Sequence, residues 1–190
     1  MSQEIEIEFK NLLTSQEYRK LDPLFHSVTP IVQINHYFET PDFALKRHGG
    51  ALRIRVKQNQ YQLTLKQPNP SGSGLLETHQ WLSEKEAGLW LSGKMTHVNE
   101  ITPLLEKLSV HWKELRYGGK LQTTRKETNY QETILVLDHS VYNGKEDFEL
   151  ELEATDEQYG NQVFTELLDA FQIEKRETPS KIERFYHTLE

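Results

Sequence analysis

The chain has 190 residues, and its 22 Lys and Arg against 29 Asp and Glu give a formal net charge of −7. This acidic balance argues against a protein that coats nucleic acid or an anionic membrane, and the absence of cysteine excludes disulfides, thiolate catalysis and cysteine-ligated metal centres. No secretory signal and no apolar run near the roughly 18 residues of a membrane span are evident, so we expect a cytoplasmic single domain over residues 1–190, as a monomer or homodimer.

Most of the chain alternates apolar and polar residues with a period of two, which predicts strands. The predicted strands are residues 4–10, 34–39, 51–57, 61–66, 75–82, 111–118, 121–126, 133–138 and 147–154. Turns between them are indicated by Gly49-Gly50, Gly118-Gly119 and Asn143-Gly144. Residues 68–74, which read PNPSGSG, predict a long hairpin loop and not a domain boundary.

Helices interrupt this strand pattern. Thr14 with Glu17, and Ser83 with Glu86, have the spacing of a capping box, which predicts a helix starting at each place. Further helices are predicted over about 99–108, over 156–171 with one apolar stripe, and from about 179 onward. Many antiparallel strands with helices among them indicate an α+β domain.

Several predicted strands carry charges of one sign on one face. The shared faces hold Glu4, Glu6 and Glu8 with Lys10; Arg53, Arg55 and Lys57; and Glu149, Glu151 and Glu153. A solvated face is the ordinary explanation for any one of these strands, but like charges on neighbouring strands repel, so whole strands of one sign are unusual. The opposite faces are apolar and need helices to cover them. We therefore expect an inverted barrel whose charged interior is favourable when it holds a polyanion and a divalent cation.

The charged strands also carry a family resemblance. Glu6-Ile7-Glu8-Phe9-Lys10 resembles the N-terminal Glu-x-Glu-x-Lys signature of the CYTH superfamily, the triphosphate tunnel metalloenzymes. Elements similar to others of that family follow in the same order: Tyr37-Phe38-Glu39-Thr40-Pro41, Leu52-Arg53-Ile54-Arg55, Leu63-Thr64-Leu65-Lys66, the strand with Glu149, and Ser180-Lys181-Ile182-Glu183-Arg184. The match runs from Glu4 to Arg184 and is most similar to the small single-domain bacterial branch.

The resemblance implies an eight-stranded antiparallel β-barrel, the triphosphate tunnel, with a charged interior and helices packed outside. It also implies Mg²⁺- or Mn²⁺-dependent attack of water on a small triphosphate, which would be tripolyphosphate or a nucleoside or thiamine triphosphate. The metal ligands carried over are Glu6, Glu8, Glu77, Glu149, Glu151 and Glu153. The substrate-binding residues are Lys10, Arg53, Arg55, Lys66, Arg125, Lys181 and Arg184, and the catalytic ones are Glu8, Asp138 and Lys181.

Two readings other than hydrolysis stay open. A class IV adenylate cyclase would need an adenine pocket, for which the sequence gives no sign. A non-catalytic polyphosphate- or nucleotide-binding module is the other, because His79 replaces the second carboxylate of a Glu-x-Glu pair that many relatives carry on this strand. We expect His79 to be a hydrogen-bonding residue and Glu4 not to be a ligand. Trp81, Trp90 and Trp112 are expected to pack in the protein and not to stack on bases.

Overall fold

The eight strands of the computed structural model, which describes residues 2–189, form a closed antiparallel barrel in the order β1-β5-β4-β3-β2-β6-β7-β8. The strands are β1 (Ser2–Leu13), β2 (Ile31–Glu39), β3 (Ala51–Lys57), β4 (Gln60–Pro68), β5 (Leu75–Leu82), β6 (Arg116–Tyr130), β7 (Thr133–Tyr142) and β8 (Lys145–Ala154). The α-helices are α1 (Ser15–Leu21), α2 (Ala44–Arg47), α3 (Glu84–Leu91), α4 (Thr102–Lys107), α5 (Glu157–Ala170) and α6 (Lys181–His187). Two 3-10 helices, η1 (Asp22–Phe25) and η2 (Trp112–Glu114), complete the elements, and the predicted eight-stranded barrel is confirmed.

The contacts of the chain divide into two compact units. The first unit comprises residues up to 5 and residues 33–120, and the second comprises residues 6–32 and those from 121 onward. The strand β1 therefore contributes its start to the first unit and the rest of its length to the second.

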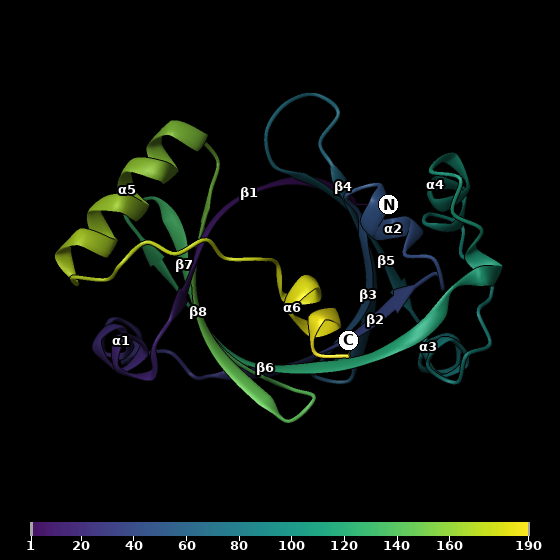
Figure 1. Ribbon diagram of the computed structural model, residues 1–190, viewed down its shortest axis with the longest axis horizontal. Coiled ribbons are helices and arrows are strands. Elements are labelled where there is room, and N and C mark those ends of the chain that lie inside the picture. Colours follow the sequence, from purple (N-terminus) through teal and green to yellow (C-terminus); the bar gives the residue numbers. More distant parts are fainter. Residues whose placement is uncertain (1, 190) are drawn as a thin grey trace. The chain divides into compact units, whose positions relative to one another are not determined.

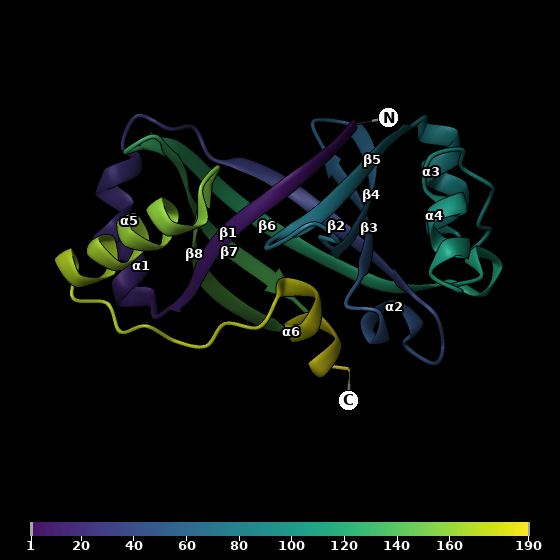
Figure 2. The ribbon, with the colours of Figure 1, turned by 90° about the horizontal axis from the view of Figure 1, so that it is seen from above.

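In the first unit, helices cover the apolar face of β3, β4 and β5. Leu52, Ile54, Leu63 and Leu65 point to this face and pack with Trp90 of α3 in one buried cluster. Figures 1 and 2 show α3 and α4 beside β4 and β5. Because side chains alternate along a strand, this packing turns the odd-numbered residues of β3 to the opposite, polar face.

In the second unit, α1 and α5 cover the apolar face of β7 and β8 (Figure 1). Leu135 and Leu137 of β7 and Leu150 and Leu152 of β8 lie in a buried cluster with the stripe of α5, which includes Phe164. The opposite face of the same strands carries the acidic residues of β8. The apolar stripe predicted for residues 156–171 is confirmed in this cluster.

Three helices begin at capping boxes. Thr14 caps α1, Ser83 caps α3 and Ser180 caps α6, and in each case the glutamate three residues later accepts a hydrogen bond from the backbone N–H of the capping residue. The first two were predicted from spacing alone. The third fixes where α6 starts and thereby places Lys181 at its first position.

The predicted strand over residues 111–118 and the predicted turn at Gly118-Gly119 are wrong. Residues Trp112–Glu114 form η2, and β6 then runs without interruption from Arg116 to Tyr130. Gly119 has φ 131, a backbone conformation that glycine adopts readily. The Gly118-Gly119 pair therefore allows a local change of backbone conformation within a long strand, and the chain does not turn back here. The strands predicted separately over residues 111–118 and 121–126 are thus replaced by the single strand β6.

Hairpin turns occur both with and without glycine. The predicted turn at Asn143-Gly144 joins β7 to β8 with positive φ at both residues. The same backbone is adopted by Gln58-Asn59 between β3 and β4 and by Gln131-Glu132 between β6 and β7. Neither pair has the composition that indicates a tight turn, and both were missed.

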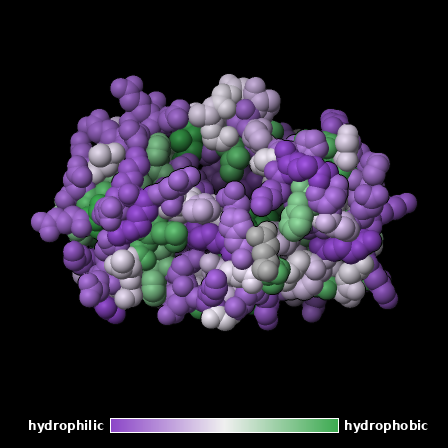
Figure 3. Space-filling view, viewed as in Figure 1, coloured by the Kyte–Doolittle hydropathy of each residue, from purple (hydrophilic) through white to green (hydrophobic). Residues whose placement is uncertain are grey.

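The face shown in Figure 3 carries mostly hydrophilic side chains with small hydrophobic areas between them. No helix within residues 2–189 combines the length and the apolar character needed to cross a membrane.

Replacing Asn11 with alanine is expected to lower the free energy of unfolding by about 2 kcal/mol, because buried backbone groups would lose their partners. The buried Asn11 amide donates to the carbonyls of Leu12 and Glu174 at 3.0 Å and accepts from the Arg176 N–H at 2.7 Å. Thermal unfolding should show a decrease in Tm of about 4–8 °C. Glu174→Ala is the control: its side chain is exposed and its carbonyl is kept, so an equal Tm decrease in both variants would contradict the assignment.

Candidate functional site

Strand pairing places opposite charges side by side on the polar face of the second unit. In register, Lys10 of β1 faces Glu151 of β8, Asp138 of β7 faces Glu149, and Arg125 of β6 faces Asp138. Paired residues of antiparallel strands point to the same face, so these side chains from four strands meet.

Lys181 of α6 joins this face and contacts three carboxylates. Its Nζ lies 2.7 Å from Glu149 Oε1 and 3.0 Å from Asp138 Oδ2, and it also pairs with Glu151. Burial disfavours its charged form, but the carboxylates raise the pKa of Lys181 well above its usual value. The ammonium group therefore stays charged in the site.

Arg125 binds the same carboxylates from the β6 side. Its Nε and Nη2 donate to the two oxygens of Asp138 at 2.9 and 2.7 Å, and Nη2 also donates to Glu151 at 2.6 Å. Asp138 is completely buried, and both of its oxygens are engaged by Arg125 and Lys181. This geometry makes Asp138 a residue that positions the two cations.

The pKa values of the two central glutamates are shifted in opposite directions. Burial raises the pKa of Glu149 to about 7, Lys181 opposes the rise, and the neighbouring Glu151 adds to it. Burial acts on Glu151 in the same sense, yet Lys181 and Arg125 hold its pKa well below the usual range. Near neutral pH, Glu149 can hold a proton while Glu151 remains a carboxylate.

Arg184 lies one helical turn after Lys181 and points to the same carboxylates. It donates to Asp147 at 2.9 Å and pairs with Glu149. Tyr142 also donates to Asp147, at 2.6 Å, and burial together with this carboxylate raises the pKa of Tyr142 to about 12. Asp147 was missed, although alternation with Glu149 could have found it.

A second acidic group follows along β1 and β8. Glu8 is the register partner of Glu153, and Lys10 contacts Glu8 at 3.1 Å. Burial raises the pKa of Glu153; Arg125 opposes this, and the carboxylates of Glu151, Glu127 and Glu8 add to it. Directly facing carboxylates repel, and a hard divalent cation between them would remove that cost, so these oxygen donors fit Mg²⁺ or Mn²⁺. Glu6 is on the same face of β1.

In the first unit the polar face is basic. Lys66 pairs with Glu77, and Arg53 Nη2 lies 4.0 Å from the other oxygen of Glu77. Within residues 2–189, no acceptor lies within hydrogen-bond distance of the buried Nε of Arg53. A buried guanidinium N–H without an acceptor is costly, and a phosphate oxygen is an acceptor that would satisfy it.

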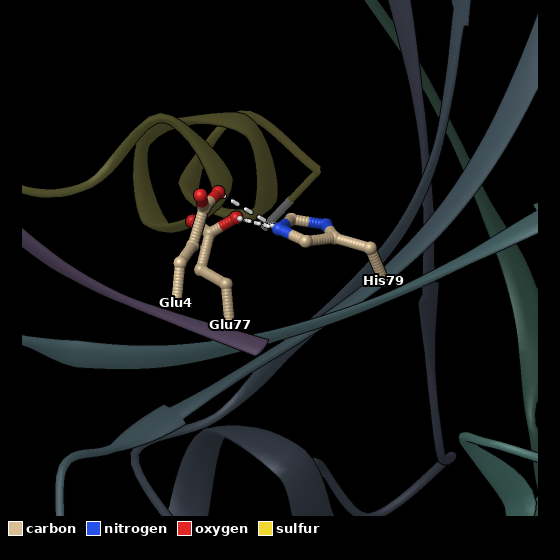
Figure 4. A group of neighbouring side chains, drawn as sticks. All are labelled: Glu4, Glu77 and His79. Carbon is tan, nitrogen blue, oxygen red and sulfur yellow. Dashed lines mark hydrogen bonds and ion pairs between the residues drawn. The ribbon is translucent and has the colours of Figure 1, made fainter. Parts of the chain in front are cut away.

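Both ring nitrogens of His79 have polar partners. Its Nδ1 is 3.0 Å from Thr64 Oγ1, and its Nε2 is 2.9 Å from Glu4 and 3.5 Å from Glu77. Figure 4 shows both carboxylates pointing toward the imidazole. The expected hydrogen-bonding role is confirmed, but the ligand atoms of Glu4, Glu77 and His79 also lie within 4.8 Å of one another, so this group could hold a metal ion. Glu4 was expected not to be a ligand, and the structure places it in this group.

The structure gathers the predicted site residues in two sets. The first unit brings together Arg53, Arg55, Lys66 and Glu77. The second unit brings together Glu6, Glu8, Lys10, Arg125, Asp138, Glu149, Glu151, Glu153, Lys181 and Arg184. Polar residues on the same faces that were not predicted are Gln33, Asn35, Thr64 and Asp147.

Comparison with known proteins gives one consistent result. The CYTH domain family model matches residues 4–186. YjbK of Bacillus subtilis, provisionally named a triphosphatase, is 46% identical over 188 residues, covering 98% of this chain and 96% of that protein.

Solved structures show the same similarity. A crystal structure from Bacillus halodurans, provisionally named an adenylate cyclase, has a TM-score of 0.92 and 43% identity, covering 98% of this chain and all of its own. HpAC1 from Hippeastrum, a provisional adenylyl cyclase described as having a dominant triphosphatase activity, has a TM-score of 0.77 at 22% identity, covering 96% of each chain. At that identity the second similarity concerns the fold alone.

Proposed function

Because the chain belongs to the CYTH domain family, we propose that it is a metal-dependent triphosphatase that releases orthophosphate from tripolyphosphate or a small organic triphosphate. The provisional name of YjbK, at 46% identity, supports hydrolysis as the reaction class.

The proposal rests mainly on the buried Nε–H of Arg53, which has no hydrogen-bond acceptor among residues 2–189. Arg53 and Lys66 both approach Glu77, and the guanidinium retains this buried donor. A bound phosphate would accept from that donor. We propose that Arg53, Arg55 and Lys66 bind phosphate oxygens in this way.

The second unit carries oxygen donors suited to a divalent cation and positive charge of its own. Glu6, Glu8 and Glu153 would hold Mg²⁺ or Mn²⁺, which when bound supplies Lewis acidity and charge neutralisation at phosphate oxygens. The prediction that Glu149 and Glu151 are also ligands stays a prediction, since Lys181, Arg125 and Arg184 already occupy their oxygens. The Glu4, Glu77 and His79 group is the other candidate location.

The reaction needs little covalent chemistry from the protein. Water adds to the terminal phosphorus, the bridging P–O bond breaks, and orthophosphate and a shortened phosphate chain result. Charge accumulates on the phosphoryl oxygens, and cations held in place by buried carboxylates lower that barrier without reorganising. Asp138 would act by fixing Arg125 and Lys181.

The test is phosphate release from tripolyphosphate, ATP and thiamine triphosphate with Mg²⁺ or Mn²⁺, for the wild type and Glu8→Gln. We expect metal-dependent turnover, lowered about tenfold or more in Glu8→Gln and partly recovered at higher metal concentration, because loss of one ligand weakens metal binding. The control is Glu146→Gln, which removes an exposed carboxylate from β8, the strand that pairs with β1, and this variant should retain full activity. No phosphate release from any substrate with either metal would refute the proposal.

An adenylate cyclase is the second candidate, favoured by the provisional name of the 43% identical Bacillus halodurans protein. It would convert ATP into cAMP and pyrophosphate without orthophosphate. Analysis of the products of the same ATP reaction separates the two. Tight binding of triphosphate without any product would instead indicate a binding module.

A further inference from the structure

Trp81 is the residue whose environment departs most from expectation. It was expected to pack in the protein, but 62% of its surface is exposed, in contrast to the buried Trp90. On β5 it has the parity of Glu77 and His79, which lie on the polar face, whereas Leu82 next to it packs in the core of the first unit. The indole therefore points away from the buried apolar cluster of the first unit.

The strand register places hydrogen-bonding residues in one line with Trp81 across the sheet. Trp81 pairs with Gln62 of β4, Gln62 with Arg55 of β3, and Arg55 with Asn35 of β2. These four residues form one row across the sheet, which we call the Trp81 row. Arg55 Nε donates to Asn35 Oδ1 at 3.0 Å, and Asn35, only 1% exposed, has no partner for its Nδ2 within residues 2–189. The row thus offers a flat aromatic surface beside amide and guanidinium donors.

The row lies next to the basic residues that would bind phosphate. Along the same three strands, the next row contains His79, Thr64 and Arg53, and the one after it contains Glu77 and Lys66. Successive residues on one face of a strand are about 7 Å apart and neighbouring strands about 5 Å apart, so Arg53 lies one row and two strands from Trp81, and Lys66 lies two rows and one strand from it. A sugar or a short alkyl chain followed by the phosphate chain, together with the length of the Arg53 and Lys66 side chains, spans such a separation.

We propose that Trp81 stacks on the heteroaromatic ring of an organic triphosphate, with the amide of Gln62 on the neighbouring strand donating or accepting hydrogen bonds at the ring edge. The inference rests on the proposed function and specifies its substrate class: an organic triphosphate with a flat nitrogen heterocycle, and not tripolyphosphate alone. Aromatic side chains bind such rings by stacking, and a positively charged ring gains a further attraction to the indole face.

The experiment compares wild type, Trp81→Ala and Trp81→Phe in two assays. The first measures kcat and KM for tripolyphosphate, ATP and thiamine triphosphate with Mn²⁺. The second measures, by calorimetry, Kd for tripolyphosphate and for β,γ-methylene ATP. We expect Trp81→Ala to raise KM about tenfold or more for ATP or thiamine triphosphate, the loss typical of removing one stacking partner, with tripolyphosphate unchanged within about twofold. Trp81→Phe should recover most of the affinity.

Val141→Ala, which removes another exposed apolar strand side chain, is the control for nonspecific surface effects. Equal constants in wild type and Trp81→Ala for all ligands overturn the inference, as does a parallel loss for tripolyphosphate. So does a wild type that neither hydrolyses nor binds the organic ligands. If the wild type hydrolyses nothing, the proposed function fails, and the Kd for β,γ-methylene ATP alone decides the role of Trp81.

Discussion

Replacing Lys181 with methionine is expected to lower the rate of tripolyphosphate hydrolysis by about 100-fold or more, the cost of removing one preorganised charge-stabilising group. Lys181 is a single ammonium in contact with Asp138, Glu149 and Glu151. Without it Arg125 and Arg184 remain against the same carboxylates, and the positive charge available to phosphate oxygens falls. The measurement is kcat/KM under saturating Mn²⁺.

Loss of Lys181 also leaves buried carboxylates without their partner, so stability must be followed separately. Lys181→Arg keeps the charge and should retain more activity than Lys181→Met at a similar Tm. Lys175→Met, which removes an exposed lysine preceding the same helix, should change neither rate nor Tm. A folded Lys181→Met protein with the wild-type rate would exclude Lys181 from the reaction.

Adding one methyl group to α5 at Gly160 is expected to destabilise the protein. A Cβ at this position would lie 2.6 Å from the Cβ of Ala154 and 2.6 Å from the ring of Phe9. Overpacking of this kind costs about 1–3 kcal/mol. Gly160→Ala should therefore lower the midpoint of denaturant unfolding, even though alanine is the better helix former.

The matched control is Gly88→Ala in α3. Apart from its chain neighbours and the backbone of α3, no atom of the described residues lies within 4 Å of a Cβ built at Gly88, so this variant should gain the helix propensity of alanine, about 1 kcal/mol. The same substitution in two helices is thus expected to have opposite signs. A stabilised Gly160→Ala protein would show that α5 can move away from β1 and β8 without cost.

Strict alternation explains why much of the barrel could be predicted. In Glu4–Lys10 and Asp147–Ala154, each charge marks one face and each apolar residue the other, so the side chains of β1 and β8 were assigned to the correct faces before any pairing was known. Capping boxes likewise fixed the start of α1 and α3 because they depend on four consecutive residues. Both signals are local.

The remainder depends on contacts between distant residues. Gly118-Gly119 has the composition of a turn, and only the pairing of β6 along its length shows that the chain continues straight. Alternation on β5 places Trp81 on the face of Glu77 and His79, but how much of its side chain is exposed depends on which strand faces the helices cover. His79 could be assigned hydrogen bonds from its sequence position, but not the specific partners Thr64 and Glu4.

The pairing of β1 with β8 has a consequence for how the protein folds during synthesis. In the first unit β2, β3, β4 and β5 pair with their neighbours in sequence, so these hairpins can form as soon as they leave the ribosome. In the second unit Leu13 pairs with Phe148, so the β8 side of β1 stays unpaired until β8 has been made, although the other neighbour of β1 in the barrel, β5, already ends at Leu82. The nascent chain should therefore gain protease resistance first over residues 33–82, and the pairing of β1 with β8 should form last.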